Sequence, residues 1–200
     1  CQDCVKGGHG LGLRCYGSAI MRISPSETAT MTQPRPLDGI RVLEVGQLLA
    51  GPFAGSLLAY YGAEVIKVEP PGGGDPLRQW RILDDDGTSF WWRSLGRNKK
   101  CVTADLRSDA GRDLVGRLAR KSDVLIENFR PGVMERLGLG PDLLRADHPE
   151  LIYCRISGYG QSGPDAGRAG HDVNYLAQSG VLELIGVPDR PPSIPGIQIA

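Results

Sequence analysis

Long hydrophobic runs are missing from this sequence. Its longest apolar stretches, at 48–50 and 57–61, fall far short of the roughly 20 residues that a membrane-spanning helix needs. A net charge is missing as well, because 23 basic and 23 acidic residues cancel, and this argues against a bulk electrostatic hold on nucleic acid or an anionic membrane. Aromatic residues are sparse at 6%, whereas apolar residues reach 40%, a composition that suits a soluble globular domain. We expect no nucleic-acid partner and no membrane partner.

Cysteine is scarce too. The chain has five cysteines, an odd number. Cys101 and Cys154 lie in apolar, strand-like segments, where a cysteine usually behaves as a small buried hydrophobe. This usage is typical of a reducing compartment, and we expect the protein to be cytoplasmic.

The first 30 residues differ from the remainder. They carry three of the five cysteines, show no clear periodicity and lack the ordered parts of a signal peptide. A zinc site is one alternative, with the candidate ligands Cys1, Cys4, His9 and Cys15. Its spacing is irregular and the usual second pair is missing, so we expect no metal. Residues 1–30 are interpreted as a disordered extension, or as translated sequence upstream of a start at Met31, and 31–200 as the globular domain.

The pattern after Met31 predicts a repeating unit. A β-branched run at 40–45 is typical of a strand. Residues 46–51 turn the chain, and Pro52 suits the first position of a helix that continues to Tyr61. A second strand is expected at 64–69. A strand, a helix and a strand within about 30 residues indicate a parallel α/β sheet.

The same alternation continues along the chain. A region rich in Gly, Pro and Asp at 70–86 is expected to be a loop. Further strands are expected at 101–105, 123–127 and 151–156, and helices at 108–121, 133–137 and 141–146. We therefore assign the fold class as α/β, a Rossmann-like open, mostly parallel sheet with helices on both faces.

Ligands of such a sheet bind at the carboxyl ends of its strands. The loops at those ends are 45–51, 69–78, 105–108, 127–132 and 157–163, and each is rich in glycine, amide or charge. The first loop matches neither the dinucleotide fingerprint GxGxxG nor a P-loop, since Pro52 follows Gly51 where lysine is required. A plain strand-to-helix turn stays open, and a nicotinamide-dependent enzyme is a weaker alternative.

Cations gather near several strand ends. Residues 97–100 form a basic cluster just before a strand, and Arg107, Arg130 and Arg136 add further positive charge. Guanidinium and ammonium groups suit the phosphates of a nucleotide-type cofactor. A solvated charged face is the alternative, because charge runs usually have no other role.

An aromatic side chain also follows a predicted strand. Phe129 is a candidate to pack on an adenine ring, with Asn128 hydrogen-bonding nearby. Ordinary turn chemistry at 131–132 explains the same residues without a ligand.

His171 is a candidate general base, since a histidine beside Asp172 can have a pKa near neutral. The alternative is structural: Asp172 caps a helix that runs through Tyr175 and Leu182, and His171 merely precedes it. The sequence alone does not distinguish the two.

Three collinear segments carry a resemblance to a known family. They are 36–80 (PLDGIRVLEVGQLLAGPFAG…DPLRQW), 97–140 (RNKKCVTADLRSDAG…IENFRPGVMERLGLG) and 151–186 (LIYCRISGYGQSGPDAGRAGHDVNYLAQSGVLELIG). From Leu37 to Ala200 the chain resembles the N-terminal part of the class III CoA-transferases, the CaiB/BaiF family, which includes α-methylacyl-CoA racemases. The resemblance implies the large domain of that fold, an interlocked homodimer of full-length subunits, and an acyl-CoA and a carboxylic acid as substrates, with no permanently bound cofactor.

The resemblance also implies contacts with coenzyme A at the predicted rim. Carried over by motif position, they fall at Leu49, Ala50, Ala104, Asp105, Leu106, Arg107, Asn128, Phe129, Arg130 and Arg136. Residues Gly170, Asp172, Asn174 and Tyr175 join them from the GHDxNY motif around His171. Pro70 stands where family members often have a phosphate-binding arginine, and Lys67 or Arg78 is a candidate substitute.

The resemblance implies two alternative chemistries. The transferases use one aspartate as nucleophile, and by motif position it would directly follow Ala200. A carboxylate attacks a thioester to give a mixed anhydride, which the CoA thiolate reopens. The racemases pair the same aspartate with the histidine of the GHDxNY motif, so His171 would exchange the α-proton of a 2-methylacyl-CoA. We favour the transferase because 72–100 is longer than expected of a racemase; an inactive CoA-binding fragment is a third alternative.

Overall fold

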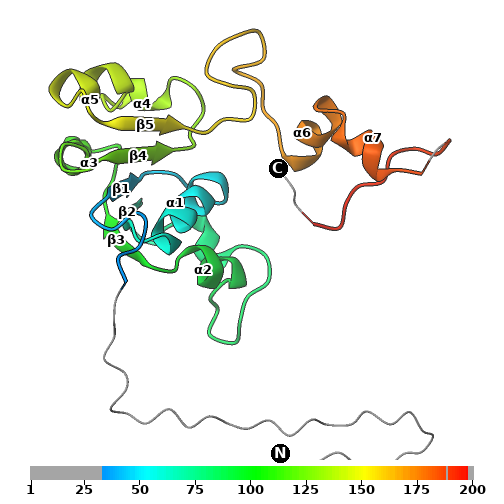
Figure 1. Ribbon diagram of the computed structural model, residues 1–200, viewed down its shortest axis with the longest axis horizontal. Helices are drawn as coiled ribbons and strands as arrows, with labels where there is room; N and C mark the ends of the chain where they lie inside the picture. The colour runs from blue at the N-terminus through cyan, green and yellow to red at the C-terminus, as the bar shows by residue number, and fades with distance from the viewer. Residues whose placement is uncertain (1–32, 188, 198–200) are drawn as a thin grey trace, which may run out of the picture. The chain divides into compact units, whose positions relative to one another are not determined.

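The computed structural model describes residues 33–187 and 189–197, and the elements below all belong to one compact unit that begins at Pro34. The cysteine-rich segment 1–30 lies outside the described residues. Five strands form one all-parallel sheet in the order β3-β2-β1-β4-β5 (Figure 1). Their bounds are β1 Arg41–Glu44, β2 Glu64–Glu69, β3 Lys99–Thr103, β4 Val124–Glu127 and β5 Ile152–Arg155. The predicted α/β class with a parallel sheet is confirmed.

Helices connect the strands. They are α1 Ala50–Tyr60, α2 Phe90–Leu95, α3 Asp109–Ala119, α4 Val133–Arg136, α5 Pro141–Asp147, α6 Asp172–Gln178 and α7 Val181–Ile185, with a 3₁₀ turn η1 at Pro76–Gln79. Within the described part of the chain, no helix is long and apolar enough to cross a bilayer.

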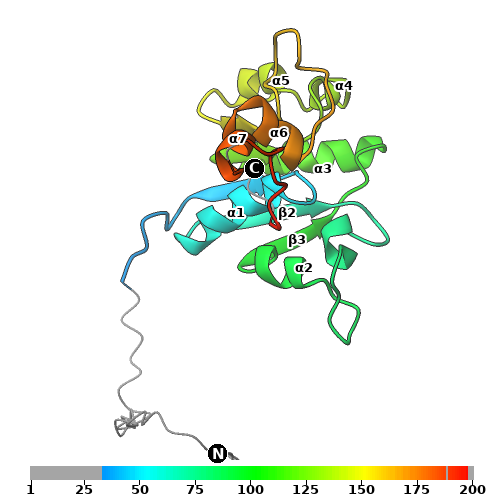
Figure 2. The ribbon, with the colours of Figure 1, turned by 90° about the vertical axis from the view of Figure 1, so that its right-hand side faces the viewer.

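Alternating side chains of the strands build a core on each face of the sheet. Leu43 and Leu125 point to one face, where they pack with Val115 of α3 and with residues of α4 and α5. Their neighbours Val42 and Ile126 point to the other face and join Ala59 of α1. This period of two is what a strand buried on both sides requires. Helices therefore cover both faces, as predicted, and Figure 2 shows α1, α2 and α3 around the strands. Because all five strands are parallel, their carboxyl ends lie at one edge of the sheet, which we call the rim.

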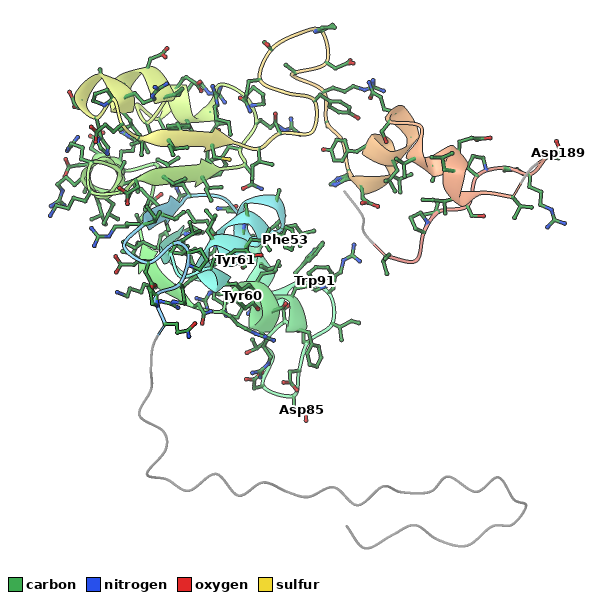
Figure 3. The ribbon with its side chains drawn as sticks, viewed as in Figure 1. Phe53, Tyr60, Tyr61, Asp85, Trp91 and Asp189 are labelled. Atoms are coloured by element: carbon green, nitrogen blue, oxygen red, sulfur yellow. The ribbon has the colours of Figure 1, made fainter. Side chains whose placement is uncertain are left out.

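Helix α1 approaches its face closely because its inner side carries small residues. Gly55 is the tightest of them, since an added Cβ would collide with Oε2 of buried Glu44. The outer side carries the large residues instead: Phe53, Tyr60 and Tyr61 are each more than half exposed, at 54%, 51% and 58% (Figure 3). The close approach brings the helix backbone next to a charged group on β1, which matters for the site below.

Two predicted starts were two residues late. Helix α1 begins at Ala50 with Leu49 as its N-cap, so Pro52 is the third helical residue. Proline is tolerated there because the first four N–H groups of a helix have no intrahelical partner. Strand β3 begins at Lys99, two residues before the predicted start, because it pairs with β2 over its whole length. Lysine is depleted in strands, so the sequence pattern hid this start.

Other local expectations also differed. Cys101 was predicted to be buried but is exposed, because β3 is an edge strand, and Cys154 is half-buried. The predicted loop 70–86 contains η1. The helix expected to run through Leu182 is two helices, since Gly180 adopts a φ of 79° between α6 and α7.

Candidate functional site

Two pockets lie on the rim of the sheet and share Phe129. The first has a volume of about 360 Å³ and is lined by Val45, Gln47, Val68, Glu69, Pro70, Pro71, Ala104, Asp105, Leu106, Arg107, Phe129 and Leu137. The second, of about 410 Å³, reaches from Leu48 and Asn128 through Phe129 and Arg130 to Tyr159, Gly170, His171 and Tyr175. Residues from the loops after all five strands therefore meet at one place, as expected of a parallel sheet.

Most of the expected coenzyme A contacts line these pockets. Ala104, Asp105, Leu106 and Arg107 line the first, whereas Asn128, Arg130, Gly170, His171 and Tyr175 line the second. Five predicted residues line neither pocket: Leu49, Ala50, Arg136, Asp172 and Asn174. Leu49 and Ala50 instead begin α1, and Arg136 ends α4. The structure thus places most of the predicted residues at the two pockets, and their contact with coenzyme A stays a prediction.

The loop after β1 separates the two pockets. Gln47 lines the first and Leu48 the second. The Asn128 side chain holds Gln47 from the β4 side: its Oδ1 accepts the Gln47 N–H at 2.8 Å and its Nδ2 donates to the Gln47 carbonyl at 2.9 Å. Gly46 and Gly51 make room for this amide, because a Cβ on either would press on Asn128 Oδ1. Asn128 therefore shapes the loop between the pockets.

A fully buried ion network supports the same loop from the α1 side of the sheet. Lys67 Nζ lies 2.8 Å from Glu44 Oε1, 2.7 Å from Asp75 Oδ2 and 3.0 Å from the Gly46 carbonyl. Lys99 Nζ lies 2.7 Å from Glu44 Oε2 and donates to the Pro52 carbonyl at 2.7 Å. All four ionic side chains are at most 1% exposed. Two positive and two negative charges balance, which is the condition for burying them.

The network sets the protonation of its lysines. Burial acts to lower the pKa of Lys67, but the charges of Glu44 and Asp75 outweigh it, and the pKa of Lys67 is raised. Lys99 has one carboxylate partner, Glu44. Burial outweighs the attraction of that carboxylate, so the pKa of Lys99 is lowered. Lys67 is therefore a permanent cation inside the sheet face and is not exposed to any ligand.

This corrects the expected substitutes for the missing arginine at Pro70. Lys67 is fully buried and cannot reach a phosphate. Arg78 pairs with Glu69 at 2.9 Å, and its guanidinium lies 3.8 Å from the ring centre of Trp92. Its Nε and Nη2 are thus engaged by Glu69, and Arg78 lines neither rim pocket. Arg107 is the cation that remains available in the first pocket: its side chain is 86% exposed and its ion partner is Asp105 at 2.9 Å.

The basic cluster at 97–100 was also wrongly placed. Lys99 and Lys100 begin β3, and in a parallel sheet the strand starts lie at the edge opposite the rim. Lys99 belongs to the buried network, and Lys100 pairs with Glu64 at 2.5 Å. Neither lysine lines either rim pocket.

Glu127 positions the shared aromatic ring. Its Oε2 accepts the Phe129 N–H at 2.7 Å, and its Oε1 lies 3.3 Å from Arg155 Nε. Burial raises the pKa of Glu127, and the Phe129 N–H and Arg155 oppose that rise. The carboxylate fixes the turn that puts Phe129 between the pockets, a role that spacing alone did not reveal.

His171 lies at the open side of the second pocket. It is the N-cap of α6, and its N–H donates to Asn174 Oδ1 at 2.9 Å, so the predicted cap at Asp172 was one residue late. The imidazole belongs to an exposed residue, whereas Asp172 is buried. Tyr175 donates its hydroxyl to the Gly170 carbonyl at 2.8 Å and its ring meets Tyr159 edge-on. The motif thus builds a rigid turn that leaves His171 accessible.

Gln47, Pro71 and Tyr159 are among the pocket residues that sequence reasoning did not single out. All three lie in loops that the rim argument had marked, so position after a strand was the signal that could have found them.

An all-parallel sheet in the order 3-2-1-4-5 with pockets on its carboxyl rim is the architecture of a Rossmann-type α/β domain. Residues 37–200 match CoA-transferase family III, and the chain belongs to this family. A succinyl-CoA–D-citramalate CoA-transferase from Chloroflexus aurantiacus is 53% identical over 166 residues, which are 83% of this chain and 41% of that protein. A succinate–glutarate CoA-transferase from Agrobacterium fabrum is 43% identical over 171 residues, 82% of this chain and 43% of that protein.

Solved structures show the same fold. A CaiB/BaiF family protein from Brucella suis superposes with a TM-score of 0.76 at 43% identity, over 83% of this chain and 45% of that one. A hypothetical protein from Mycobacterium tuberculosis superposes with a TM-score of 0.74 at 43% identity, over 84% and 46%. The chain spans less than half the length of these relatives.

Proposed function

We propose that the full-length protein is an acyl-CoA:carboxylate CoA-transferase with succinyl-CoA as donor and a small dicarboxylic acid as acceptor. The observation that carries the proposal is the pair of pockets that meet at Phe129, one with exposed Arg107 and one with exposed His171. A long ligand with a charged nucleotide end and a reactive thioester end needs two adjoining subsites of this kind. The substrate classes come from the names of the relatives.

The first pocket suits the nucleotide end of coenzyme A. Arg107 offers a guanidinium to a phosphate, and its pKa is raised by the hydrogen bond from its side chain to Asp105, so it stays charged. Leu106, Phe129 and Leu137 give the pocket apolar walls against which an adenine ring can pack. The loop with Gln47 and Leu48 then leads to the second pocket, where the thioester would lie.

The transfer itself requires a carboxylate nucleophile. An aspartate expected to follow Ala200 would attack the thioester carbonyl, forming an acyl anhydride and releasing the CoA thiolate. The thiolate would attack the aspartyl carbonyl, giving an enzyme thioester and the free donor acid. The acceptor carboxylate would repeat these steps in reverse, so no proton transfer to carbon is needed.

A racemase is the second candidate, because His171 is accessible at the second pocket within the GHDxNY motif. A histidine there could take the α-proton of a 2-methylacyl-CoA. The two candidates differ in whether CoA changes its acid or the α-carbon exchanges hydrogen.

One experiment separates them. The full-length protein is incubated in deuterated water with succinyl-CoA and citramalate, malate or glutarate, and separately with a chiral 2-methylacyl-CoA, and products are weighed by mass spectrometry. We expect a new CoA thioester of an added acid and no deuterium at the α-carbon. Deuterium exchange without a co-acid would instead support the racemase, and neither product would refute both.

The variant His171→Ala sharpens the distinction. We expect it to weaken transfer only in part, because the nucleophile is a carboxylate, whereas it would abolish racemisation. Loss of transfer as complete as that caused by replacing the aspartate would contradict this division of roles. The same full-length protein is predicted to be a homodimer, which its mass in solution tests.

A further inference from the structure

The segment between the two pockets is held in an unfavourable shape. Leu48 has a φ of 61°, in the left-handed region that a branched, bulky residue rarely adopts. Such a conformation persists only where the surroundings impose it, and it is concentrated at functional sites. Leu48 lines the second pocket and its neighbour Gln47 lines the first. The shape of this segment therefore contributes to the walls of both pockets.

Contacts from the ion network impose that shape. Asp75 Oδ1 accepts the Leu48 N–H at 3.1 Å, and it also accepts the N–H of Leu77 at 2.8 Å. The other oxygen of Asp75 pairs with Lys67, whose Nζ donates to the Gly46 carbonyl at 3.0 Å. The network thus forms hydrogen bonds with the backbone on both sides of Gln47, and Asn128 hydrogen-bonds to Gln47 itself from the β4 side.

Stability alone does not account for this network. A buried ion pair contributes little net stability, because the cost of removing the charges from water offsets their attraction, and an apolar replacement of the same volume is often as stable. The charged side chains supply directional hydrogen bonds: Asp75 and Lys67 each bond to one backbone group of the loop. An apolar set of residues could fill the space but could not make those bonds.

We propose that Asp75 and Lys67 are positioning residues that hold residues 46–48 in the conformation required to bind an acyl-CoA across the two pockets. The identity of the ligand in this inference rests on the proposed function, whereas the contacts that hold the loop do not depend on it. Neither side chain touches the ligand, since both are buried. Their effect passes through the loop backbone.

The test compares three variants of the full-length protein. Asp75→Ala removes both the bond to Leu48 and the charge that faces Lys67, whereas Asp75→Asn keeps an acceptor for the Leu48 N–H. Ser56→Ala is the matched control: Ser56 is a buried hydroxyl at the same sheet face, within 2.8 Å of the Pro52 carbonyl and 2.7 Å of the Leu95 carbonyl, and does not contact the loop. The readouts are the Kd for coenzyme A, kcat and KM, and hydrogen exchange of the peptide that contains Leu48.

We expect Asp75→Ala to raise the Kd for coenzyme A about tenfold, the loss of one well-placed hydrogen bond, and Asp75→Asn to raise it about threefold. Ser56→Ala should lower the melting temperature but leave the Kd unchanged. Exchange at Leu48 should accelerate in Asp75→Ala and much less in Asp75→Asn. An unchanged Kd in Asp75→Ala would overturn the inference, as would equal effects of all three variants.

The test stays decisive if Asp75→Ala does not fold or if the wild-type protein does not bind coenzyme A. If Asp75→Ala does not fold, Asp75→Asn against Ser56→Ala still decides, since a purely structural role predicts lower stability with wild-type Kd in both. If the wild-type protein does not bind coenzyme A, the proposed function fails. The exchange of Leu48 in Asp75→Asn and Asp75→Ala then shows separately whether Asp75 holds the loop.

Discussion

Substitutions of two single glycines test how tightly α1 packs on the ion network. Gly55 lies in α1, where an added methyl group would collide with Glu44 Oε2. Gly116 lies in α3 and is equally buried, but its nearest neighbours would be 3.9 Å from a Cβ. We expect Gly55→Ala to destabilise the fold by about 1–3 kcal/mol through overpacking. Gly116→Ala should stabilise it by about 0.4–1 kcal/mol, because alanine favours a helix. Urea unfolding measures the change in unfolding free energy of each variant. Changes of the same sign in both variants would contradict the packing described for α1.

A second residue-scale prediction concerns acid. Hydrogen bonds from Lys100 and Arg41 lower the pKa of Glu64 from 4.5 to about 2. Below pH 4.5 the unfolded chain binds a proton that the folded chain does not, so stability from Glu64 is present above that pH and lost as the pH falls toward 2.

We therefore expect the melting temperature of Glu64→Gln to fall less than that of the wild type between about pH 5 and pH 3. The group is partly exposed, so the difference should shrink in about 0.5 M salt. If the melting temperatures of the wild type and Glu64→Gln fell equally with pH at low salt, Glu64 would not be the source of this acid sensitivity.

The candidate site could be predicted only in part at this scale. Position after a strand was enough to mark Arg107, Phe129 and His171 as rim residues. It could not reveal that Lys67 is buried or that Arg78 pairs with Glu69 and stacks on Trp92, because both depend on packing between elements. Ionisable residues in a strand look like solvent-exposed positions until their partners are known.

At the element scale, two helix caps differ in their surroundings. Ser108 Oγ accepts the Gly111 N–H at 3.0 Å and caps α3 at the surface. Ser89 Oγ accepts the Trp91 N–H at 3.1 Å, but it is fully buried and also donates to the Trp80 carbonyl at 2.7 Å. Ser108→Ala should cost about 1 kcal/mol. Both hydroxyls also donate to a backbone carbonyl, Ser108 to Asp105 at 2.8 Å at the surface and Ser89 to Trp80 at 2.7 Å beside its buried cap. Ser89→Ala should cost more, roughly 2–3 kcal/mol, because water replaces the lost bonds less easily at a buried position. Chemical unfolding checks this order, and an equal or reversed order would contradict it.

Elements with a clear period were predictable and those made by tertiary contacts were not. Strand β2 was predicted with its observed bounds, since 64–69 combines β-branched residues with a glycine turn before it. Helix α2 was not predicted, because FWWRSL has no helical period of its own and the helix depends on the Ser89 cap and on packing beside α1 and η1. The start of strand β3 was missed because lysine has a low strand propensity, whereas in the structure Lys99 pairs with buried Glu44 and Lys100 pairs with Glu64 at the surface.

For the whole molecule, order in the sheet explains why distant residues meet. Strand β1 is central between β2 and β4, so the loop after it is flanked by Asp75 from one neighbour and Asn128 from the other. No local pattern contains that information, because the strand order 3-2-1-4-5 follows from right-handed crossovers and packing on both faces. The central loop is consequently held from both sides, by Asp75 and by Asn128.

The most direct measurement is a calorimetric titration of the full-length protein with coenzyme A. Arg107→Ala is compared with Arg117→Ala, which removes an equally charged side chain that pairs with Asp113 at 3.0 Å on α3. We predict saturable binding by the wild type, a Kd raised roughly tenfold to a hundredfold by Arg107→Ala, and a wild-type Kd for Arg117→Ala. Absence of binding, or an equal Kd for the two variants, would contradict a coenzyme A site on this rim.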